Sequence, residues 1–273
     1  MGELNEIRDP IDEKIYDLIK KSGNSFHATV ARWFSDNDWH VVVSPYYMDQ
    51  TQNKAREIDL VAEKLWPVDK SGPQDYVAVR LFIECKFVAS PSVFWFAEKD
   101  RKSAQELVCV ASSPFRANNI DIQEHHYLAQ SSKVAKLFAT DARKAPENEP
   151  FYKALNQVLN AMVSMRKKPI STPAVKKFRS QQAVLEFPVV VCSSFDQIYS
   201  VDFYTGSQPK PIEDNFQLEV RYAYIDRNNK QRDDYFLLDF VEFNQLGQFA
   251  AAIDRNAKIA AKWVWLELGF VIN

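Results

Sequence analysis

Apolar residues recur at helical spacing in two segments at the start of the chain. The first segment contains Ile11, Ile15, Leu18 and Ile19, and the second contains Phe26, Val30, Trp33 and Phe34. Each set falls on one face of an α-helix. Asp9-Pro10 is typical of a helix start, and Ser25 is a suitable N-cap for the second helix. The pattern predicts a helix within residues 1–22 and another over residues 26–36.

Beyond Trp39 the periodicity changes to that of β-strands. Three apolar segments follow, WHVVVSPYY, REIDLVAE and YVAVRLFIECKF, separated by a polar loop and by the turn-rich LWPVDKSGPQD. Apolar segments bounded by turn residues predict three strands, near residues 40, 58 and 82, which we expect to form a meander. Residues 90–130 give no clear assignment.

The remaining chain predicts a helix over residues 151–165, an interior strand at FPVVVC and a final helix over residues 246–257. FQLEVRYAYI and DYFLLDFVEF alternate between apolar and polar residues, and Asn228-Asn229 between them is typical of a hairpin turn. We therefore expect one α/β domain over residues 1–273. It would consist of an N-terminal helix (1–22), a core (23–195) and a C-terminal extension made of the hairpin and helix (196–273).

Composition places the chain among globular proteins, because 46% of its 273 residues are hydrophobic. The formal net charge of -2 gives no global attraction to nucleic acid, so an anionic partner would need a local basic patch. The N-terminus does not resemble a signal peptide, and no apolar segment approaches the roughly 18 residues of a membrane helix. The cytoplasm is therefore the expected location. Cys85, Cys109 and Cys192 show no metal-binding spacing and are expected to be small buried residues.

Strand alternation isolates three charged residues. In the third strand it places Val79, Leu81, Ile83 and Cys85 on one face, and Phe82, Glu84 and Lys86 on the other. In REIDLVA it places Ile58, Leu60 and Ala62 on one face, and Glu57, Asp59 and Val61 on the other. If the two strands pair, Asp59 lies beside Glu84, with Lys86 at the same end. Two adjacent carboxylates repel, and a divalent cation would remove the conflict.

Hard oxygen ligands of this kind suit Mg²⁺, with Mn²⁺ as the alternative. A bound metal would polarise a phosphoryl oxygen and lower the pKa of a water molecule, while Lys86 could orient that water or stabilise developing negative charge. The residues therefore indicate phosphodiester hydrolysis.

Asp59 followed by Glu84-Cys85-Lys86 resembles the D-(x)n-(D/E)-x-K signature of the PD-(D/E)XK nuclease superfamily. The resemblance implies a restriction-endonuclease-like fold, in which an α-β-β-β-α-β core forms a mixed central sheet flanked by helices. The predicted order over residues 23–195 is similar. The resemblance also implies that Asp59 and Glu84 bind the metal, that the main-chain carbonyl of Cys85 is a third ligand, and that Lys86 is catalytic. Asp12-Glu13-Lys14 has the same spacing by chance and does not end a strand.

Three further residues are candidate accessories. Many members of the superfamily supply a glutamate from the first helix, and His27 stands at the corresponding position here. It could bind the metal directly or through water, mark a site that binds without cutting, or be a hydrogen-bonded structural residue. Glu57 shares a predicted face with Asp59, although a salt bridge to Arg56 or Lys54 is the favoured role. Gln157 could reach the site from the later helix or remain in solvent.

A segment after residue 165 contains six basic residues and no acid. They are Arg166, Lys167, Lys168, Lys176, Lys177 and Arg179. Such a patch could bind phosphates, or it could be a solvated loop. For the pair His125-His126 the sequence favours surface or capping roles. For Phe94-Trp95-Phe96 core packing is favoured over base stacking.

The leading hypothesis is a Mg²⁺-dependent endonuclease acting on DNA, with RNA left open and with defence or DNA repair as the uses that the superfamily implies. One alternative is a nuclease-like domain that binds nucleic acid without cutting. Another is a scaffolding protein that uses the C-terminal hairpin and helix for docking. A second copy of the chain or a partner protein could supply targeting.

Overall fold

The fold is described from a computed structural model, which covers residues 10–21, 23–68, 75–111, 120–140, 150–166, 168–178, 180–226 and 228–269. The helices are α1 (Pro10–Lys21), α2 (Asn24–Asp36), α3 (Arg101–Ala111), α4 (His126–Ala129), α5 (Pro150–Met165) and α6 (Leu246–Gly269). Short 3₁₀ segments occur at Ile120–Glu124, Pro173–Lys177 and Phe243–Gln245. Within the described residues, every helix is too short or too polar to cross a membrane.

Ten strands form one mixed sheet in the order β1-β4-β5-β8-β12-β11-β7-β6-β9-β10, and β2 and β3 form a separate hairpin. The first five strands are β1 (His40–Val43), β2 (Tyr46–Asp49), β3 (Lys54–Glu57), β4 (Leu60–Pro67) and β5 (Tyr76–Lys86). The next four are β6 (Ser92–Glu98), β7 (Lys133–Thr140), β8 (Gln181–Cys192) and β9 (Ile198–Asp202). The last three are β10 (Lys210–Pro211), β11 (Phe216–Ile225) and β12 (Gln231–Glu242).

The part of the sheet that matters most for the site is an antiparallel meander followed by a parallel strand. β4 pairs with β1 on one side and with β5 on the other, both antiparallel. β8 then joins β5 in parallel, and α5 precedes β8 along the chain. The predicted order of helix, meander, helix and strand is therefore present. The structure adds the β2–β3 hairpin between β1 and β4, because WHVVVSPYY and REIDLVAE each divide into two strands.

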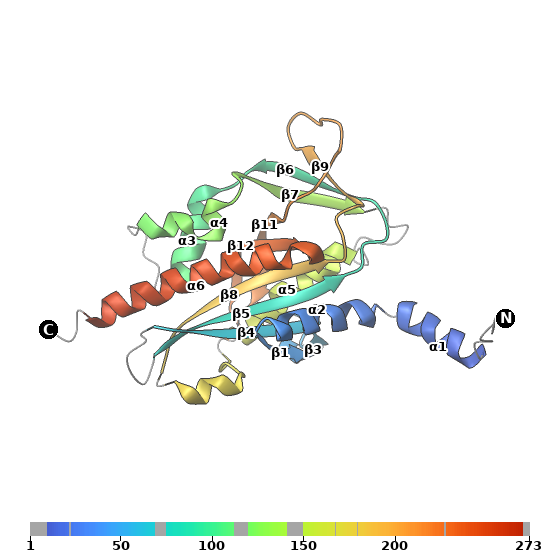
Figure 1. The fold of residues 1–273 in the computed structure, drawn as a ribbon. Helices are drawn as coiled ribbons and strands as arrows, with labels where there is room; N and C mark the ends of the chain where they lie inside the picture. The colour runs from blue at the N-terminus through green and yellow to red at the C-terminus, as the bar shows by residue number, and fades with distance from the viewer. Residues whose placement is uncertain are drawn as a thin grey trace, which may run out of the picture.

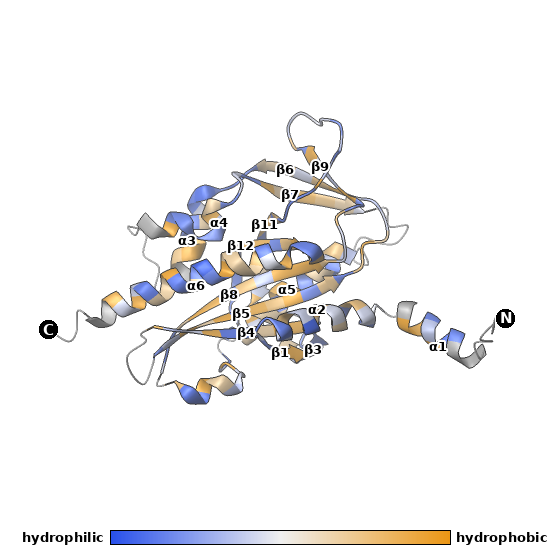
Figure 2. Cartoon of the chain, viewed as in Figure 1, coloured by the Kyte–Doolittle hydropathy of each residue, from blue (hydrophilic) through white to orange (hydrophobic). Residues whose placement is uncertain are grey.

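Helices cover both faces of the central strands (Figure 1). One hydrophobic cluster joins α2, α3, α4 and α6 to inward residues such as Leu81, Ile83 and Phe187. The other cluster packs α5 against the opposite face, through residues such as Phe82 and Val190. Because β5 and β8 are buried on both faces, they are almost continuously apolar, as their orange colour in Figure 2 shows.

The C-terminal hairpin is part of the central sheet and not an extension added to a finished core. β11 and β12 pair as predicted, with Phe216 opposite Phe240. β12 also pairs in parallel with β8, where Asp239 lies opposite Val189. The expected boundary at residue 195 therefore falls inside one continuous sheet. The final helix continues to Gly269, well beyond the expected end at residue 257.

The two N-terminal helices differ from expectation at their ends and exposed faces. α2 begins at Asn24, and its N-cap is Gly23 with a left-handed backbone (φ 73°), so the expected cap Ser25 lies inside the helix. A glycine tolerates this conformation without strain. In α1 the apolar side chains of Ile15, Leu18 and Ile19 are exposed, whereas the stripe of α2 is buried through Val30 and Phe34.

One buried row of charges crosses three strands. Arg80 on β5 is 2% exposed and lies opposite Glu63 on β4 and Glu186 on β8. Its guanidinium donates to Glu63 Oε1 at 2.8 Å and to Glu186 Oε1 at 3.3 Å. It also donates to the main-chain oxygens of Met165, Lys168 and Pro169. Arg80 thereby holds the end of α5 and the segment after it against the sheet.

We predict that Arg80→Ala lowers the free energy of unfolding by about 3–5 kcal/mol, because it leaves Glu63 and Glu186 buried without their shared partner. Urea denaturation would measure the loss. Arg32→Ala on the exposed side of α2 is the matched control and should change the stability by less than about 0.5 kcal/mol. Equal effects of the two substitutions would contradict this account of Arg80.

Candidate functional site

Asp59 lies at a break between two strands. β3 ends at Glu57 and β4 begins at Leu60. The break is fixed by main-chain hydrogen bonds from Ser44 N–H to Asp59 O (2.8 Å) and from Ile58 N–H to Pro45 O (3.2 Å). As a result Ile58 packs into the cluster under α5, whereas Leu60 and Ala62 pack into the cluster under α6. The prediction that these three residues share one face is therefore wrong for Ile58.

The predicted proximity of Asp59 and Glu84 is confirmed. β4 and β5 pair with Leu60 opposite Ile83, which places the preceding residue Asp59 beside Glu84. The Asp59 N–H donates to Glu84 Oε1 at 3.4 Å, and the Cys85 N–H donates to Asp59 Oδ2 at 2.7 Å. The alternation predicted for β5 is also correct, because Val79, Leu81, Ile83 and Cys85 all lie in the cluster on the opposite face.

Lys86 lies at the end of β5, two residues after Glu84, and its side chain contacts the Glu84 carboxylate. Its Nζ lies 2.9 Å from Glu84 Oε2. Burial lowers the pKa of Lys86, but the charges of Glu84 and Asp59 and the hydrogen bond to Glu84 outweigh burial, so the pKa is raised overall. Lys86 is therefore a positive charge at neutral pH. Its side chain is 18% exposed, whereas that of Glu84 is 1% exposed.

His27 reaches the same group from α2. Its Nε2 lies 3.3 Å from Asp59 Oδ2, and both side chains are partly exposed. α2, the first helix of the predicted core, therefore contributes to the site, as the motif predicts, but its side chain there is an imidazole in place of a carboxylate. His27 Nε2, one Asp59 carboxylate oxygen and Cys85 Sγ lie within 4.8 Å of one another. We refer to Asp59, Glu84, Lys86 and His27 as the carboxylate centre.

The pKa of Glu84 is governed by burial. This pKa is raised to about 7 chiefly because the carboxylate is buried, while the charge of Lys86 lowers it and the smaller effect of the Asp59 charge raises it. Burial is the main cause, since a carboxylate without water is poorly stabilised. A carboxylate that lies beside another carboxylate and takes up a proton near neutral pH fits a site where a cation would replace that proton.

The donor set tests which metal would fit. Asp59 and Glu84 supply hard oxygen ligands, which suit Mg²⁺ and Mn²⁺. The Cys85 side chain is a soft ligand, but it is buried among the apolar residues under α6, and burial raises the pKa of its thiol. The residues therefore fit a hard divalent cation. The role of the Cys85 main-chain carbonyl as a ligand stays a prediction.

Glu57 does not form the expected salt bridge across the strand end. Arg56 instead binds the buried Asp49, with Nε 2.9 Å from Oδ2. Glu57 lies opposite Tyr46 in the β2–β3 hairpin, and a hydrogen bond with Glu57 raises the pKa of the Tyr46 hydroxyl. The break at residues 58 and 59 removes the geometric reason for pairing Glu57 with Asp59.

Gln157 on α5 reaches the main chain of β3, two residues before Asp59. Its Nε2 donates to the main-chain oxygen of Glu57 at 3.2 Å, and the Tyr47 hydroxyl donates to the main-chain oxygen of Gln157 at 3.2 Å. Gln157 Oε1 is buried and has no hydrogen-bond partner among the described residues. Gln157 is thus a structural link between α5 and the strand that leads to Asp59, and not a solvated side chain.

The basic segment after α5 is held in place by acids of the sheet. Glu63 Oε2 accepts from the Ser171 and Thr172 N–H groups at 2.7 and 3.1 Å, beside its ion pair with Arg80. Arg166 lies 3.7 Å from Glu186, and Lys168, Lys176 and Lys177 are exposed. Lys167 and Arg179 lie outside the described residues. The described part of the segment is therefore an anchored surface and not a free loop.

His125 and His126 are buried, so a surface role for them is wrong. The His125 Nδ1 caps α4 by accepting from the Tyr127 N–H at 3.2 Å, which confirms the capping role. His126 lies 3.0 Å from Asp239 Oδ2 and also contacts the side chain of Asn256. Two adjacent histidines in sequence give no signal for partners more than 100 residues away. Core packing of Phe94 is confirmed.

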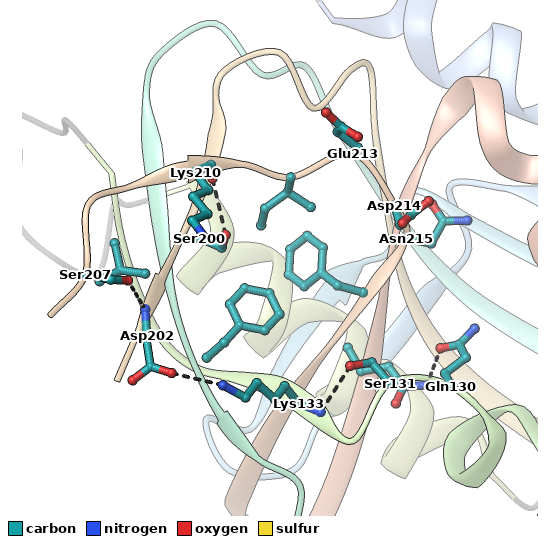
Figure 3. A pocket seen from close by; sticks show the side chains of 15 residues that line it. Gln130, Ser131, Lys133, Ser200, Asp202, Ser207, Lys210, Glu213, Asp214 and Asn215 are labelled. Carbon is teal, nitrogen blue, oxygen red and sulfur yellow. Dashed lines mark hydrogen bonds and ion pairs between the residues drawn. The ribbon is translucent and has the colours of Figure 1, made fainter. Parts of the chain in front are cut away.

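Figure 3 shows a separate cavity of about 440 Å³ between β6, β9, β10 and the start of β11. Its rim carries the ion pair between Lys133 and Asp202, at 3.0 Å. Asp59, Glu84 and Lys86 do not line this cavity. The carboxylate centre instead stands at the end of β5, on the part of the sheet that α2 and α5 flank.

Comparison of the chain with protein-family models, with curated proteins and with solved structures gave no match. The case for a function therefore depends on the geometry and chemistry of the chain's own residues.

We predict that Glu84→Gln stabilises the metal-free protein in a pH-dependent manner. The raised pKa means that Glu84 contributes stability that is full below pH 4.5, its ordinary pKa, and is lost as the pH rises to about 7. The variant has no such loss. The difference in free energy of unfolding between variant and wild type should therefore increase by up to about 3 kcal/mol, in favour of the variant, between pH 4.5 and about 7.

Urea denaturation in EDTA at about pH 4, 6 and 8 would measure this gain. Mg²⁺ or Mn²⁺ should stabilise the wild type at the highest pH and should have little effect on Glu84→Gln. A difference between the two proteins that is constant with pH, or an equal response of both to metal, would contradict the assignment.

Proposed function

We propose that this protein is a Mg²⁺- or Mn²⁺-dependent nuclease that hydrolyses phosphodiester bonds of DNA. The observation that carries the proposal is the convergence of Asp59, Glu84 and Lys86 at one end of two paired strands, where the Glu84 carboxylate accepts from the Asp59 main-chain N–H and from Lys86 Nζ. Two neighbouring carboxylates that could hold a divalent cation, with an ammonium beside one of them, suit metal-assisted phosphodiester hydrolysis.

Each residue of the carboxylate centre has a distinct role in this proposal. Asp59 and Glu84 would hold the cation, which when bound polarises a phosphoryl oxygen and lowers the pKa of a water molecule. The Cys85 N–H fixes the orientation of Asp59 by its 2.7 Å hydrogen bond. Lys86 keeps its proton at neutral pH, because neighbouring acids raise its pKa, and can donate to the negative charge that develops on the attacked phosphate.

The topology agrees with this proposal. α2, the antiparallel strands β1, β4 and β5, then α5 and the parallel strand β8 occur in the order of the α-β-β-β-α-β core of PD-(D/E)XK nucleases, with the β2–β3 hairpin inserted after β1 and the segment β6-α3-α4-β7 inserted after β5. The acids also fall where that motif has them, with Asp59 just before one strand and Glu84 near the end of the next. The proposal is therefore supported by the order of the secondary-structure elements as well as by the three side chains.

Local positive charge supports a polyanionic substrate. The chain has a net charge of -2, so it attracts a polyanion only through local basic surface. Lys168, Lys176 and Lys177 provide such a surface on the segment that Arg80 and Glu63 anchor to the sheet. Phosphate contacts of this kind give affinity without sequence specificity.

A second function, binding of nucleic acid without cleavage, is favoured by one observation. His27 occupies the first-helix position and lies 3.3 Å from Asp59 Oδ2. The imidazole thus contacts a carboxylate oxygen that a metal would need. Protection of DNA from an added nuclease, without cleavage in either Mg²⁺ or Mn²⁺, would support this second function over the first.

We predict that the wild type cleaves DNA in Mg²⁺ or Mn²⁺, and that Lys86→Ala lowers the rate about 100-fold or more, because the developing negative charge loses its donor. Gel assays with plasmid and linear DNA would measure the rates. Lys14→Ala is the matched control, since Asp12-Glu13-Lys14 has the same spacing as Glu84-Cys85-Lys86 and α1 lies outside the centre. Equal activity of the two variants, or no cleavage by the wild type, would reject the proposed activity.

We predict that His27→Glu lowers the Mg²⁺ concentration for half-maximal cleavage about tenfold, because a third carboxylate increases the negative charge and the number of hard ligands. Titration of activity with Mg²⁺ would measure the shift. His27→Gln removes the imidazole without adding charge and is the control. An unchanged metal requirement in His27→Glu would show that His27 is not part of the metal site.

A further inference from the structure

A second cavity, of about 480 Å³, lies between the β2–β3 hairpin, α5 and β11, and its lining includes Gln157, which hydrogen-bonds the strand that leads to Asp59. The wall includes three tyrosines and the three amides that α5 supplies: Tyr47, Tyr152, Tyr222, Asn156, Gln157 and Asn160. We call these six residues the tyrosine–amide pocket. Its volume lies in the range of small-ligand sites and is sufficient for one nucleobase.

Helical spacing explains why one helix supplies most of this wall. Tyr152, Asn156 and Asn160 are spaced four residues apart on α5 and therefore form one row along it. Gln157 belongs to the neighbouring row. The wall is thus built on a rigid element, with an aromatic ring at one end of the row and amides along it.

The charges around the pocket are balanced. Asp49 is 1% exposed, and its carboxylate forms an ion pair with Arg56 at 2.9 Å and accepts from Asn160 Nδ2 at 3.3 Å. The remaining charged group of the lining is the exposed Lys153 on α5. A polar wall with paired charges suits an uncharged, hydrogen-bonding ligand, and a single lysine suits one neighbouring phosphate.

The tyrosines provide both hydrogen bonds and ring surface. The Tyr222 hydroxyl donates to Asn156 Oδ1 at 3.1 Å, and burial, followed by the charge of Asp49, raises the pKa of Tyr222 to about 12. Tyr222 therefore stays protonated and neutral. Tyr152 is 46% exposed, and an exposed aromatic side chain is a surface on which a planar ligand can stack.

The pocket is joined to the carboxylate centre through Tyr47 and Gln157. Gln157 donates to the main chain of Glu57, two residues before Asp59, and Tyr47 donates to the main chain of Gln157. Burial raises the pKa of the Tyr47 hydroxyl, and after Asp49 the charge of Glu84 contributes to the same shift. A nucleotide bound at one place would therefore have its neighbour close to the other.

We propose that the tyrosine–amide pocket binds a single nucleobase of the substrate strand, next to the phosphate that is cleaved. The base stacks on Tyr152 and forms hydrogen bonds with the amides of α5, while Lys153 faces an adjacent phosphate. This inference rests on the proposed nuclease function. A base can enter such a pocket from a single strand or after leaving the stack of a duplex, so single-stranded DNA is the expected ligand.

The test uses a short single-stranded DNA that contains 2-aminopurine, whose fluorescence falls when it stacks. We predict that the wild type quenches this fluorescence in EDTA, and that Tyr152→Leu weakens binding about tenfold, the size of one lost base stack. Tyr152→Phe keeps the ring and should bind as the wild type does. Tyr204→Leu, at an 80% exposed tyrosine outside the pocket, is the matched control.

Equal binding by Tyr152→Leu and Tyr204→Leu would overturn the proposal, as would the absence of quenching by the wild type. Because EDTA removes metal-dependent cleavage, these results do not depend on catalysis. Intact base binding together with no cleavage in Mg²⁺ or Mn²⁺ would reject the nuclease function alone.

A second measurement avoids any variant. DNA with 5-iodouracil, irradiated on the wild type, should crosslink to peptides that contain Tyr47, Tyr152 or Tyr222, as identified by mass spectrometry. Crosslinks confined to peptides outside the tyrosine–amide pocket would overturn the proposal even if every substituted protein failed to fold.

Discussion

The antiparallel register between β4 and β5 is the constraint on which the site and its support depend. With Leu60 opposite Ile83, Asp59 comes beside Glu84 at one end, and Glu63 comes opposite Arg80 in the middle of the sheet. A shift of one residue would turn the apolar residues of β4 to the wrong faces, so two buried hydrophobic layers fix this register. The same packing that forms the core therefore brings the two carboxylates together.

The two groups of charged residues in the sheet differ in how their charges are balanced. In the row of Arg80, Glu63 and Glu186 each acid has a cation, and Arg80 also binds three main-chain oxygens. In the carboxylate centre Lys86 forms an ion pair with Glu84, and His27 lies beside Asp59, yet the pKa of Glu84 is still raised to about 7, chiefly by burial. Buried charge that is left partly unbalanced next to a partly exposed lysine is typical of a site that binds something, whereas balanced charge is typical of a structural role.

The predictions succeeded where a residue's neighbours in sequence determine its environment. Alternation along β5 assigned the faces of Ile83 and Glu84 correctly, and the β11–β12 hairpin was predicted from its own turn. Alternation failed at Ile58, because main-chain hydrogen bonds from Ser44 and to Pro45 break the strand there. The partners of Arg80 and His126, and the place of β12 beside β8, depend on segments distant in the chain, for which one sequence gives no signal.

α5 connects the candidate functions to the scaffold. It carries Tyr152, Asn156 and Asn160 of the tyrosine–amide pocket, and the side chain of Gln157 hydrogen-bonds the strand before Asp59. Its last residue, Met165, accepts a hydrogen bond from Arg80, and the basic segment follows directly. Because β5 carries both Arg80 and Glu84, one strand sets the position of α5 and of the carboxylate centre. The basic segment, however, packs at the start of β5, where Phe178 contacts Tyr76, whereas Glu84 and Lys86 lie at the end of that strand. A nucleic acid strand would therefore have to extend along β5 to touch both surfaces, which this strand and α5 hold in fixed relation.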